Sequence, residues 1–533
     1  MGLKERAAEF FAREKVRRAG RVLLVIAVLA VFLAAVGLSA YAILAYAPLK
    51  LTIDLGAEEQ TLGGFGASSA WIYQRLGEPG YERSAAKAID LLYGDDGLGL
   101  GIFRYNIGGG SADASLDGVW PYNDSNFDVN RRAESFFVAE NYESPESFAD
   151  ESNYDFGRDA AVRGLFESAL ATGNVTKVVF FVNSPHYLMT ESGVCIGREE
   201  YQNNLKPEFY GAFCDYLLLI VQKLCEMYID PLPVRPAVYV SPVNEPQWKW
   251  GGEEVSQEGC HYDADTLAAF YDVFFDKLAA FNAENGTDFE ADVFESGCYE
   301  FHPSGDDIKD YLREMSKYDY FAEIDEISVH TYHTDDALGK RRRFARFMEK
   351  NYPGIAVAAT EFCEMESGEF DTIESGMFLA KVVIRDLTMI NAVDWSWWLS
   401  VAAGGYNDGL VYWPAATEGG EDEVYVLKRY YTFGQLTRFI SAGDTRLFTK
   451  SSDPAGWAGV DAVAVRKPSG EVVVVVVNDG AAKSLTVSGL EAFAGAQVAV
   501  TTTTASKNWA ESTLTFGGEL PLEKDSVTTF VFG

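Results

Sequence analysis

The stretch VYVSPVNEPQWKW, residues 238–250, places a carboxylate directly after a short apolar run. The run is rich in β-branched residues and reaches Pro242, and Asn244, Glu245 and Pro246 follow it among tryptophans. Runs of this kind are typical of strands that are buried on both faces of a parallel sheet. In many α/β folds the loops after such strands carry the chemistry, so Glu245 is the first candidate for a catalytic acid or base.

The same arrangement occurs eight times along the chain, as a short apolar run with polar or aromatic residues at its end and a longer helical stretch after it. The runs lie at 61–71, 101–110, 177–190, 237–248, 291–300, 326–333, 355–365 and 392–401. Eight strand–helix units predict an α/β fold, a (β/α)8 TIM barrel over residues 61–438. A doubly wound open sheet is the alternative, but GGFGAS at 63–68 lacks the G-x-G-x-x-G spacing of that fold.

The pattern changes in the C-terminal region, residues 439–533. Its runs are short, rich in Val and Thr, and separated by turn residues, as in EVVVVVVNDG at 471–480. This pattern predicts a β-sandwich beside the barrel. The segment 49–60, LKLTIDLGAEEQ, alternates in the same way. We therefore expect it to add an N-terminal strand to the sandwich.

The N-terminal segment, residues 1–48, is basic and contains a long uncharged apolar stretch at 22–47. Such a stretch is long enough for a helix to cross a hydrocarbon core of about 30 Å, whereas the apolar region of a signal peptide usually has about 7–15 residues. The sequence therefore favours an uncleaved transmembrane anchor over a removed signal peptide. In either case the rest of the chain is expected to be extracytoplasmic, anchored to the membrane or secreted.

The charge and the cysteines limit the ligands and partners. The formal net charge is −35 although the N-terminal segment is basic, so the body of the chain repels phosphate backbones and no nucleic-acid partner is expected. The six cysteines show no CxxC spacing, and no metal and no cofactor are expected. Cys195 and Cys260 fall in loops after strands, where they could form a disulfide.

Two glutamates, Glu245 and Glu361, each lie at the end of an apolar run. The ends of the other apolar runs carry amides, an arginine, a histidine and indoles. The chain has no HExxH sequence, no phosphate loop and no Ser-His-Asp arrangement with a nucleophile elbow. Paired carboxylates among amides and aromatic rings are what cleavage of a glycosidic bond requires, because one protonates the leaving oxygen and the other attacks the anomeric carbon. Indole and phenol rings can stack on sugar rings.

Six stretches between about residue 60 and the C-terminus form one ordered set: GLGLGIFRYNIGGG (97–110), FVNSPHYLMTESG (181–193), SPVNEPQW (241–248), SVHTYH (328–333), ATEFCEM (359–365) and YYTFGQLTRFI (430–440). Through these stretches the chain resembles glycoside hydrolase family 30. The family consists of retaining enzymes with a barrel fused to a side β-sandwich. The resemblance implies that Glu245 is the acid/base and Glu361 the nucleophile.

The same resemblance implies a set of residues around the substrate: Arg104, Asn183, Asn244, Trp248, His330, Tyr332, Trp397 and Trp398. Asn244 would hold the sugar 2-hydroxyl, and Arg104 would orient Glu361 and keep it ionised. One of the two tryptophans would form the floor of the sugar site, while the other belongs to the core.

Within the family, SPVNEPQW and GGYNDGLVYW (404–413) resemble the endo-β-1,6-galactanases, which cut the galactan side chains of arabinogalactan. Other activities stay open: exo-β-1,6-galactobiohydrolase, β-1,6-glucanase, a glucosylceramidase-like activity, transglycosylation, and carbohydrate binding without catalysis. The insertion 111–160, with Trp120, Tyr122 and Tyr142, is interpreted as a wall or an extra subsite of the cleft. The expected partner is a polysaccharide or oligosaccharide, and a monomer is expected.

Overall fold

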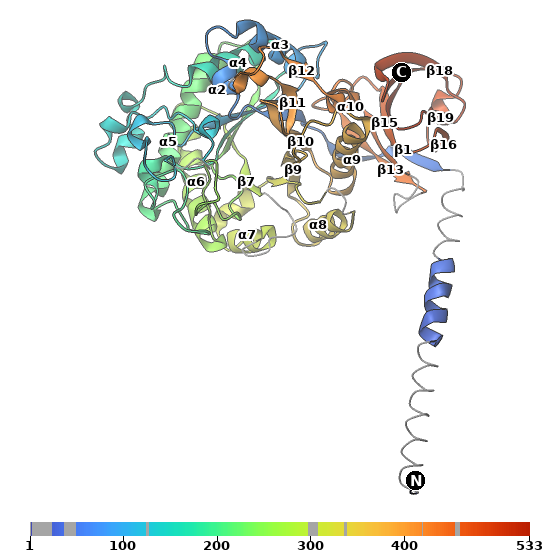
Figure 1. The fold of residues 1–533 in the computed structure, drawn as a ribbon, viewed down its shortest axis with the longest axis horizontal. Helices are drawn as coiled ribbons and strands as arrows, with labels where there is room; N and C mark the ends of the chain where they lie inside the picture. Colours follow the sequence, from blue (N-terminus) through green and yellow to red (C-terminus); the bar gives the residue numbers. More distant parts are fainter. Residues whose placement is uncertain are drawn as a thin grey trace.

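The computed structural model describes residue 2 and residues 24–36, 49–123, 127–296, 307–334, 338–417, 419–452 and 459–533. Its larger part is a barrel of parallel strands surrounded by helices, and its smaller part is a sheet of nine strands beside that barrel (Figure 1). Both predicted parts of the α/β fold are therefore confirmed.

The barrel strands follow one another around the sheet in chain order, and each pairs in parallel with the next. One strand is interrupted at Asp292, so that its first half pairs with the strand before it and its second half with the strand after it. The sheet thereby returns on itself. The strands are β2 (Gly64–Ser68), β3 (Ile102–Ile107), β4 (Lys177–Val182), β5 (Ala237–Ser241), β6 (Glu290–Ala291), β7 (Val293–Ser296), β8 (Glu326–His330), β9 (Ala356–Glu361) and β10 (Asp394–Ala402).

The helices that follow these strands pack around the sheet. Every residue of β3, β4 and β10 is buried, which explains why these strands are continuous apolar runs rather than alternating ones. The helices are α2 (Tyr73–Leu76), α3 (Glu82–Tyr93), α4 (Ala160–Ala171), α5 (Tyr210–Leu224), α6 (Ala264–Asn285), α7 (Ile308–Met315), α8 (Leu338–Asn351), α9 (Ile373–Met389) and α10 (Lys428–Thr437). After β10 a short hairpin is formed by β11 (Gly409–Tyr412) and β12 (Tyr425–Val426).

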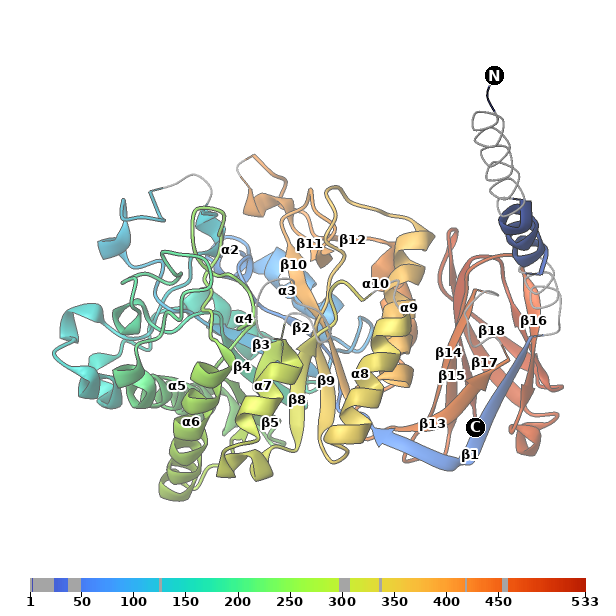
Figure 2. The same cartoon turned by 90° about the horizontal axis from the view of Figure 1, so that it is seen from below.

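The sandwich domain contains β1 (Lys50–Thr61), from the N-terminal side of the barrel, as predicted. This strand pairs antiparallel with β13 and parallel with β16, so both ends of the described body meet in one sheet (Figure 2). Helices α9 and α10 lie between the barrel and this sheet. The other strands are β13 (Thr445–Ser451), β14 (Val460–Arg466), β15 (Val472–Asn478), β16 (Lys483–Ser488), β17 (Gln497–Thr504), β18 (Lys507–Thr515), β19 (Glu519–Leu522) and β20 (Ser526–Phe532).

The N-terminal segment is described only at residue 2 and residues 24–36. Residues 24–36 are helical, and their large apolar side chains from Leu24 to Val36 are 48–70% exposed. Across the described ranges, no helix combines the length and the apolar character that a bilayer crossing needs. The transmembrane prediction covers residues 22–47, of which only residues 24–36 are described, and this described part is too short to count as a spanning helix.

The disulfide that Cys195 and Cys260 could have formed is not made, because both residues are buried free thiols. Their loops do meet, since the Gly259 N–H donates to the Cys195 carbonyl at 3.0 Å. The backbone, and not the two sulfur atoms, makes that contact.

Candidate active site

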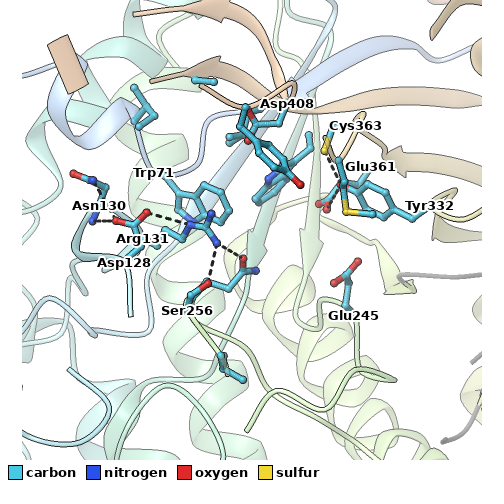
Figure 3. Close-up of a pocket in the computed structure, with 18 of the residues that line it drawn as sticks. Trp71, Asp128, Asn130, Arg131, Glu245, Ser256, Tyr332, Glu361, Cys363 and Asp408 are labelled. Atoms are coloured by element: carbon cyan, nitrogen blue, oxygen red, sulfur yellow. Dashed lines mark hydrogen bonds and ion pairs between the residues drawn. The ribbon is translucent and has the colours of Figure 1, made fainter. Parts of the chain in front are cut away.

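A cleft of about 780 Å³ lies at the carboxyl ends of the barrel strands, and both candidate glutamates line it (Figure 3). Its other predicted lining residues are Asn244, Trp248, Tyr332 and Trp398. The loops after β2, β3, β5, β9 and β10 supply most of its wall. The barrel therefore brings together residues that lie far apart in the sequence.

Glu245 follows β5 in a backbone conformation that is unusual for a residue with a side chain, with φ at 46°. Its N–H donates to the Glu295 carbonyl at 2.6 Å, and its carbonyl accepts from Trp250 Nε1 at 2.7 Å. These two bonds hold the turn, and Oε1 of Glu245 lies 2.9 Å from His330 Nδ1. The carboxyl group is thus fixed from both its backbone and its side chain.

Glu361 is the last residue of β9 and receives two hydrogen bonds. Tyr332 Oη donates to its Oε1 at 3.1 Å, and Arg104 Nη1 donates to its Oε2 at 3.3 Å. A carboxylate oxygen of Glu361 lies within 4.8 Å of one of Glu245. This close approach resembles the separation of about 5–5.5 Å between the two carboxyl groups of retaining glycosidases more than the 6.5–9.5 Å of inverting ones.

His330 lies beneath both glutamates and is fully buried. Burial alone would lower its pKa, but the carboxylates of Glu361, Glu245 and Glu295 outweigh burial and raise the pKa to about 10. Burial also raises the pKa of the Glu361 carboxyl to about 7, against the opposing positive charges of His330 and Arg104. At neutral pH the site therefore contains a cationic imidazole and a nucleophile candidate that is close to its titration point.

Glu295, near the end of β7, connects the groups around both glutamates, although the sequence reasoning gave it no role. Its Oε2 accepts from His330 Nε2 at 3.0 Å and from Arg104 Nη2, and its side chain is fully buried. Burial would raise its pKa, but Arg104 and His330 outweigh burial and hold it below its usual value. Its position at the end of a strand is the same signal that identified Glu245 and Glu361.

Four predicted substrate residues do not line the cleft. Arg104 and His330 are fully buried and contact carboxylates instead of open space. Asn183 is buried and donates to Asn106 Oδ1 at 3.4 Å. Arg104 thus lies where it was expected to orient Glu361, and direct contact of these three residues with the sugar stays a prediction.

The fourth is Trp397, whose neighbour Trp398 does line the cleft. Trp398 packs edge-to-face against Trp71 with ring centroids 5.0 Å apart. Trp397 is buried, with its ring against Phe362 and its Nε1 donating to the Asp408 carbonyl at 2.5 Å. Successive side chains of a strand point to opposite faces, so only one of the two can reach the sugar.

The glutamates and His330 also satisfy the spacing of a metal site, because each offers a ligand atom within 4.8 Å of the others. In the described chain both ring nitrogens of His330 face carboxylates, Nδ1 that of Glu245 at 2.9 Å and Nε2 that of Glu295 at 3.0 Å. These contacts suit proton transfer between the side chains.

The insertion contributes to the cleft through Asp128, Asn130 and Arg131, and the loop after β10 contributes Tyr406 and Asp408. The sequence reasoning missed these residues, because loops carry no periodicity that assigns them to a face. The aromatic residues that it named in the insertion, Trp120, Tyr122 and Tyr142, pack into apolar clusters elsewhere.

Comparison with known proteins gives one family for both parts of the chain. The model of O-glycosyl hydrolase family 30 matches residues 48–412, and the model of the glycosyl hydrolase family 30 beta sandwich domain matches residues 443–530. An endo-beta-1,6-galactanase of Hypocrea rufa is 26% identical over 458 residues, which cover 83% of this chain and 84% of that protein. An exo-beta-1,6-galactobiohydrolase of Bifidobacterium longum is 28% identical over 213 residues, 32% of this chain and 14% of that protein.

Solved structures share the fold. A conserved exported protein from Bacteroides fragilis has a TM-score of 0.74 at 22% identity and covers 90% of this chain and 100% of its own. The catalytic domain of xylanase C from Talaromyces cellulolyticus has a TM-score of 0.66 at 16% identity, with coverage of 91% and 100%.

Proposed function

The chain belongs to glycoside hydrolase family 30 and is a glycoside hydrolase, and from that premise we propose that it is a retaining endo-β-1,6-galactanase. The observation that carries the choice of substrate is the relation to the Hypocrea rufa enzyme, which extends over more than four fifths of both chains. The second relative acts on the same linkage, as its name states. A β-1,6-galactan is therefore the substrate that this chain is expected to cleave.

In the first step of the proposed reaction, Glu361 attacks the anomeric carbon while Glu245 gives its proton to the glycosidic oxygen. The bond between the anomeric carbon and that oxygen breaks, and a galactosyl ester of Glu361 forms. In the second step Glu245, now a carboxylate, takes a proton from water, and the water oxygen displaces Glu361 from the same carbon. Two displacements at one carbon restore its configuration.

The surroundings of the glutamates support these roles. Tyr332 and Arg104 donate hydrogen bonds to Glu361 and stabilise its ionised form, as a nucleophile requires. Asn244 lines the cleft beside Glu245, and its Oδ1 has no hydrogen-bond partner within the described chain. This amide is available for the sugar 2-hydroxyl.

Exo release of galactobiose is the second candidate, favoured by the Bifidobacterium longum relative. Product size separates the two: an endo enzyme releases a range of oligosaccharides from β-1,6-galactan at early times, and an exo enzyme releases galactobiose alone. Transglycosylation would add products longer than the starting oligosaccharide.

The test compares β-1,6-galactan, β-1,3-galactan, β-1,6-glucan, glucuronoxylan and nitrophenyl glycosides, with the parent, Glu245→Gln, Glu361→Gln and Glu366→Gln. The parent should act on β-1,6-galactan, and Glu361→Gln should lose all turnover. Glu245→Gln should keep activity on the nitrophenyl glycoside, whose leaving group needs no proton. Glu366 is exposed, so its variant is the control. Preferred cleavage of another polysaccharide refutes the galactanase assignment, and full activity of Glu361→Gln refutes the mechanism.

We further propose that the barrel works outside the cytoplasm, attached to a membrane through residues 22–47. Support comes from the apolar side chains of residues 24–36, which the rest of the described chain leaves uncovered. Fractionation of the source cells should place the full-length chain in the membrane fraction, with its barrel accessible to protease added outside. Recovery from the cytosol, or from the medium without residues 1–47, contradicts the proposal.

A further inference from the structure

We propose that Arg131 and Asp408 form a second sugar subsite, which binds a neutral hexose next to the sugar that is cleaved. This inference rests on the proposed function and specifies which part of the cleft recognises a longer substrate. The two residues come from different walls: Arg131 from the insertion after β3, and Asp408 from the loop after β10 (Figure 3).

The guanidinium group of Arg131 is held in place from three sides. Its Cζ lies 4.1 Å from the ring centroid of Trp71, and its Nη1 donates to Ser256 Oγ at 3.1 Å and to Gln257 Oε1 at 3.3 Å. Its Nε lies 3.5 Å from Asp128 Oδ2. The side chain remains 30% exposed, and within the described residues its Nη2 has no hydrogen-bond partner. A fixed donor therefore remains available to a ligand.

The carboxylate of Asp408 is the matching acceptor. Its backbone carbonyl accepts from Trp397 Nε1, which ties the loop to β10. No other described residue donates a hydrogen bond to its carboxylate, although burial raises the pKa of that group. The charge of Arg131 opposes this rise, and burial lowers the pKa of Arg131 against the opposing charges of Asp128 and Asp408, so Arg131 and Asp408 are near enough to affect each other. The Asp408 side chain is only partly buried at the wall of the cleft, so its carboxylate can accept hydrogen bonds from a ligand that enters there.

The chemistry of this pair suits the hydroxyl groups of a neutral sugar. A carboxylate can accept from two neighbouring hydroxyls, and the guanidinium can donate to a third oxygen. Tyr406, 38% exposed on the same loop as Asp408, adds an aromatic surface. A uronic acid is disfavoured, because its carboxylate would lie near that of Asp408.

The position of the pair puts the subsite on the glycone side. Glu361, at the end of β9, attacks the sugar that stays on the enzyme. The next strands in the sheet are β10, whose following loop carries Asp408, and then β2, whose following loop carries Trp71 beside Arg131. Trp71 and Trp398, in edge-to-face contact, connect Arg131 to the floor beside the glutamates. A substrate with two sugars before the cleaved bond would therefore reach Arg131 and Asp408, and one with a single sugar would not.

The experiment measures kcat/KM on two substrates with the same leaving group, nitrophenyl β-galactoside and the nitrophenyl glycoside of β-1,6-galactobiose. The variants are Asp408→Asn and Arg131→Met, which keep the size of each side chain. The control is Arg132→Met, since Arg132 lies over the Tyr122 ring at 4.8 Å and pairs with Asp117 away from the cleft. Melting temperatures show whether each variant folds.

Both subsite variants should lose roughly 10- to 100-fold in kcat/KM on the galactobioside, as expected for a lost hydrogen bond to a charged group. On the monosaccharide glycoside they should match the parent and Arg132→Met. Equal losses on both substrates, or none on the galactobioside, overturn the subsite. A third nitrophenyl substrate, a disaccharide with a terminal uronate, tests the neutral ligand: if the parent prefers it to the galactobioside and Arg131→Met loses that preference, the neutral ligand is overturned. A parent that is inactive on both galactosides refutes the proposed function itself, and the subsite with it.

Discussion

Replacement of Glu295 by Gln should lower the pKa of His330 by several units. The change keeps the shape of the side chain and removes one negative charge 3.0 Å from His330 Nε2. At an effective dielectric constant of about 20, two unit charges at that distance interact by roughly 5.5 kcal/mol. Because one pH unit corresponds to about 1.36 kcal/mol, this loss amounts to roughly four units. From a value of about 10, the pKa of His330 should fall to roughly 6–7.

Nuclear magnetic resonance of the histidine ring protons measures this directly, since the chain has only five histidines. A His330→Gln variant identifies the signal by its disappearance. The matched control is Asp386→Asn, which removes another buried carboxylate, 2.8 Å from Arg341 Nε and 3.0 Å from Trp395 Nε1. Both variants should melt at lower temperature than the parent, because breaking a buried ion pair costs about 3–5 kcal/mol. Only Glu295→Gln should change the His330 titration.

The sign of the pH effect on stability follows from the same pKa. The folded pKa of about 10 lies above the ordinary histidine pKa of 6.5, so folding takes up a proton between these limits. The stability that His330 contributes is fully present below pH 6.5 and is lost as the pH rises through about 10. A parent His330 that titrates near 6.5, or an unchanged pKa in Glu295→Gln, refutes the reasoning.

Three further predictions concern the reaction and the cleft. Since burial raises the pKa of Glu361 to about 7, kcat/KM should fall as the pH drops below about 7, where the nucleophile gains its proton; a flat profile down to pH 5 contradicts this. Tyr332→Phe removes a hydrogen bond to Glu361 and should lower kcat roughly 10- to 100-fold and move that acid limb to higher pH, and a change in KM alone argues against it. Trp398 lines the cleft, so Trp398→Phe should raise KM, whereas Trp397 is buried in the core, so Trp397→Phe should lower the melting temperature and leave KM unchanged. Steady-state kinetics and thermal melts of both variants test this difference.

The barrel strands could be predicted because their signal is local. A run such as KVVFFV in β4 is buried at every position, so burial on both faces appears in the sequence as continuous apolar character. The ends of these runs also identified Glu245 and Glu361, because the carboxyl ends of parallel strands gather at one edge. The interruption at Asp292 was not predicted, since a break in pairing leaves the apolar run almost unchanged.

The burial of individual site residues was harder to predict. Strand β10 is buried on both faces, so its pattern could not decide which of Trp397 and Trp398 faces the cleft. The sequence reasoning placed His330 and Arg104 near the glutamates, but the burial of these two side chains depends on packing between strands, which the sequence does not encode locally. Arg131 and Asp408 lie in long loops, where no repeat indicates which side chain turns inward.

The most direct test of the central claim is to identify the residue that forms the covalent intermediate. A fluorinated β-galactoside with a good leaving group should trap this intermediate, and mass spectrometry of the digested protein should find one sugar attached to the peptide that contains Glu361. The Glu361→Gln variant should remain unlabelled. A sugar attached to Glu245 or Glu295, or turnover that inverts the anomeric carbon without an adduct, would contradict the account.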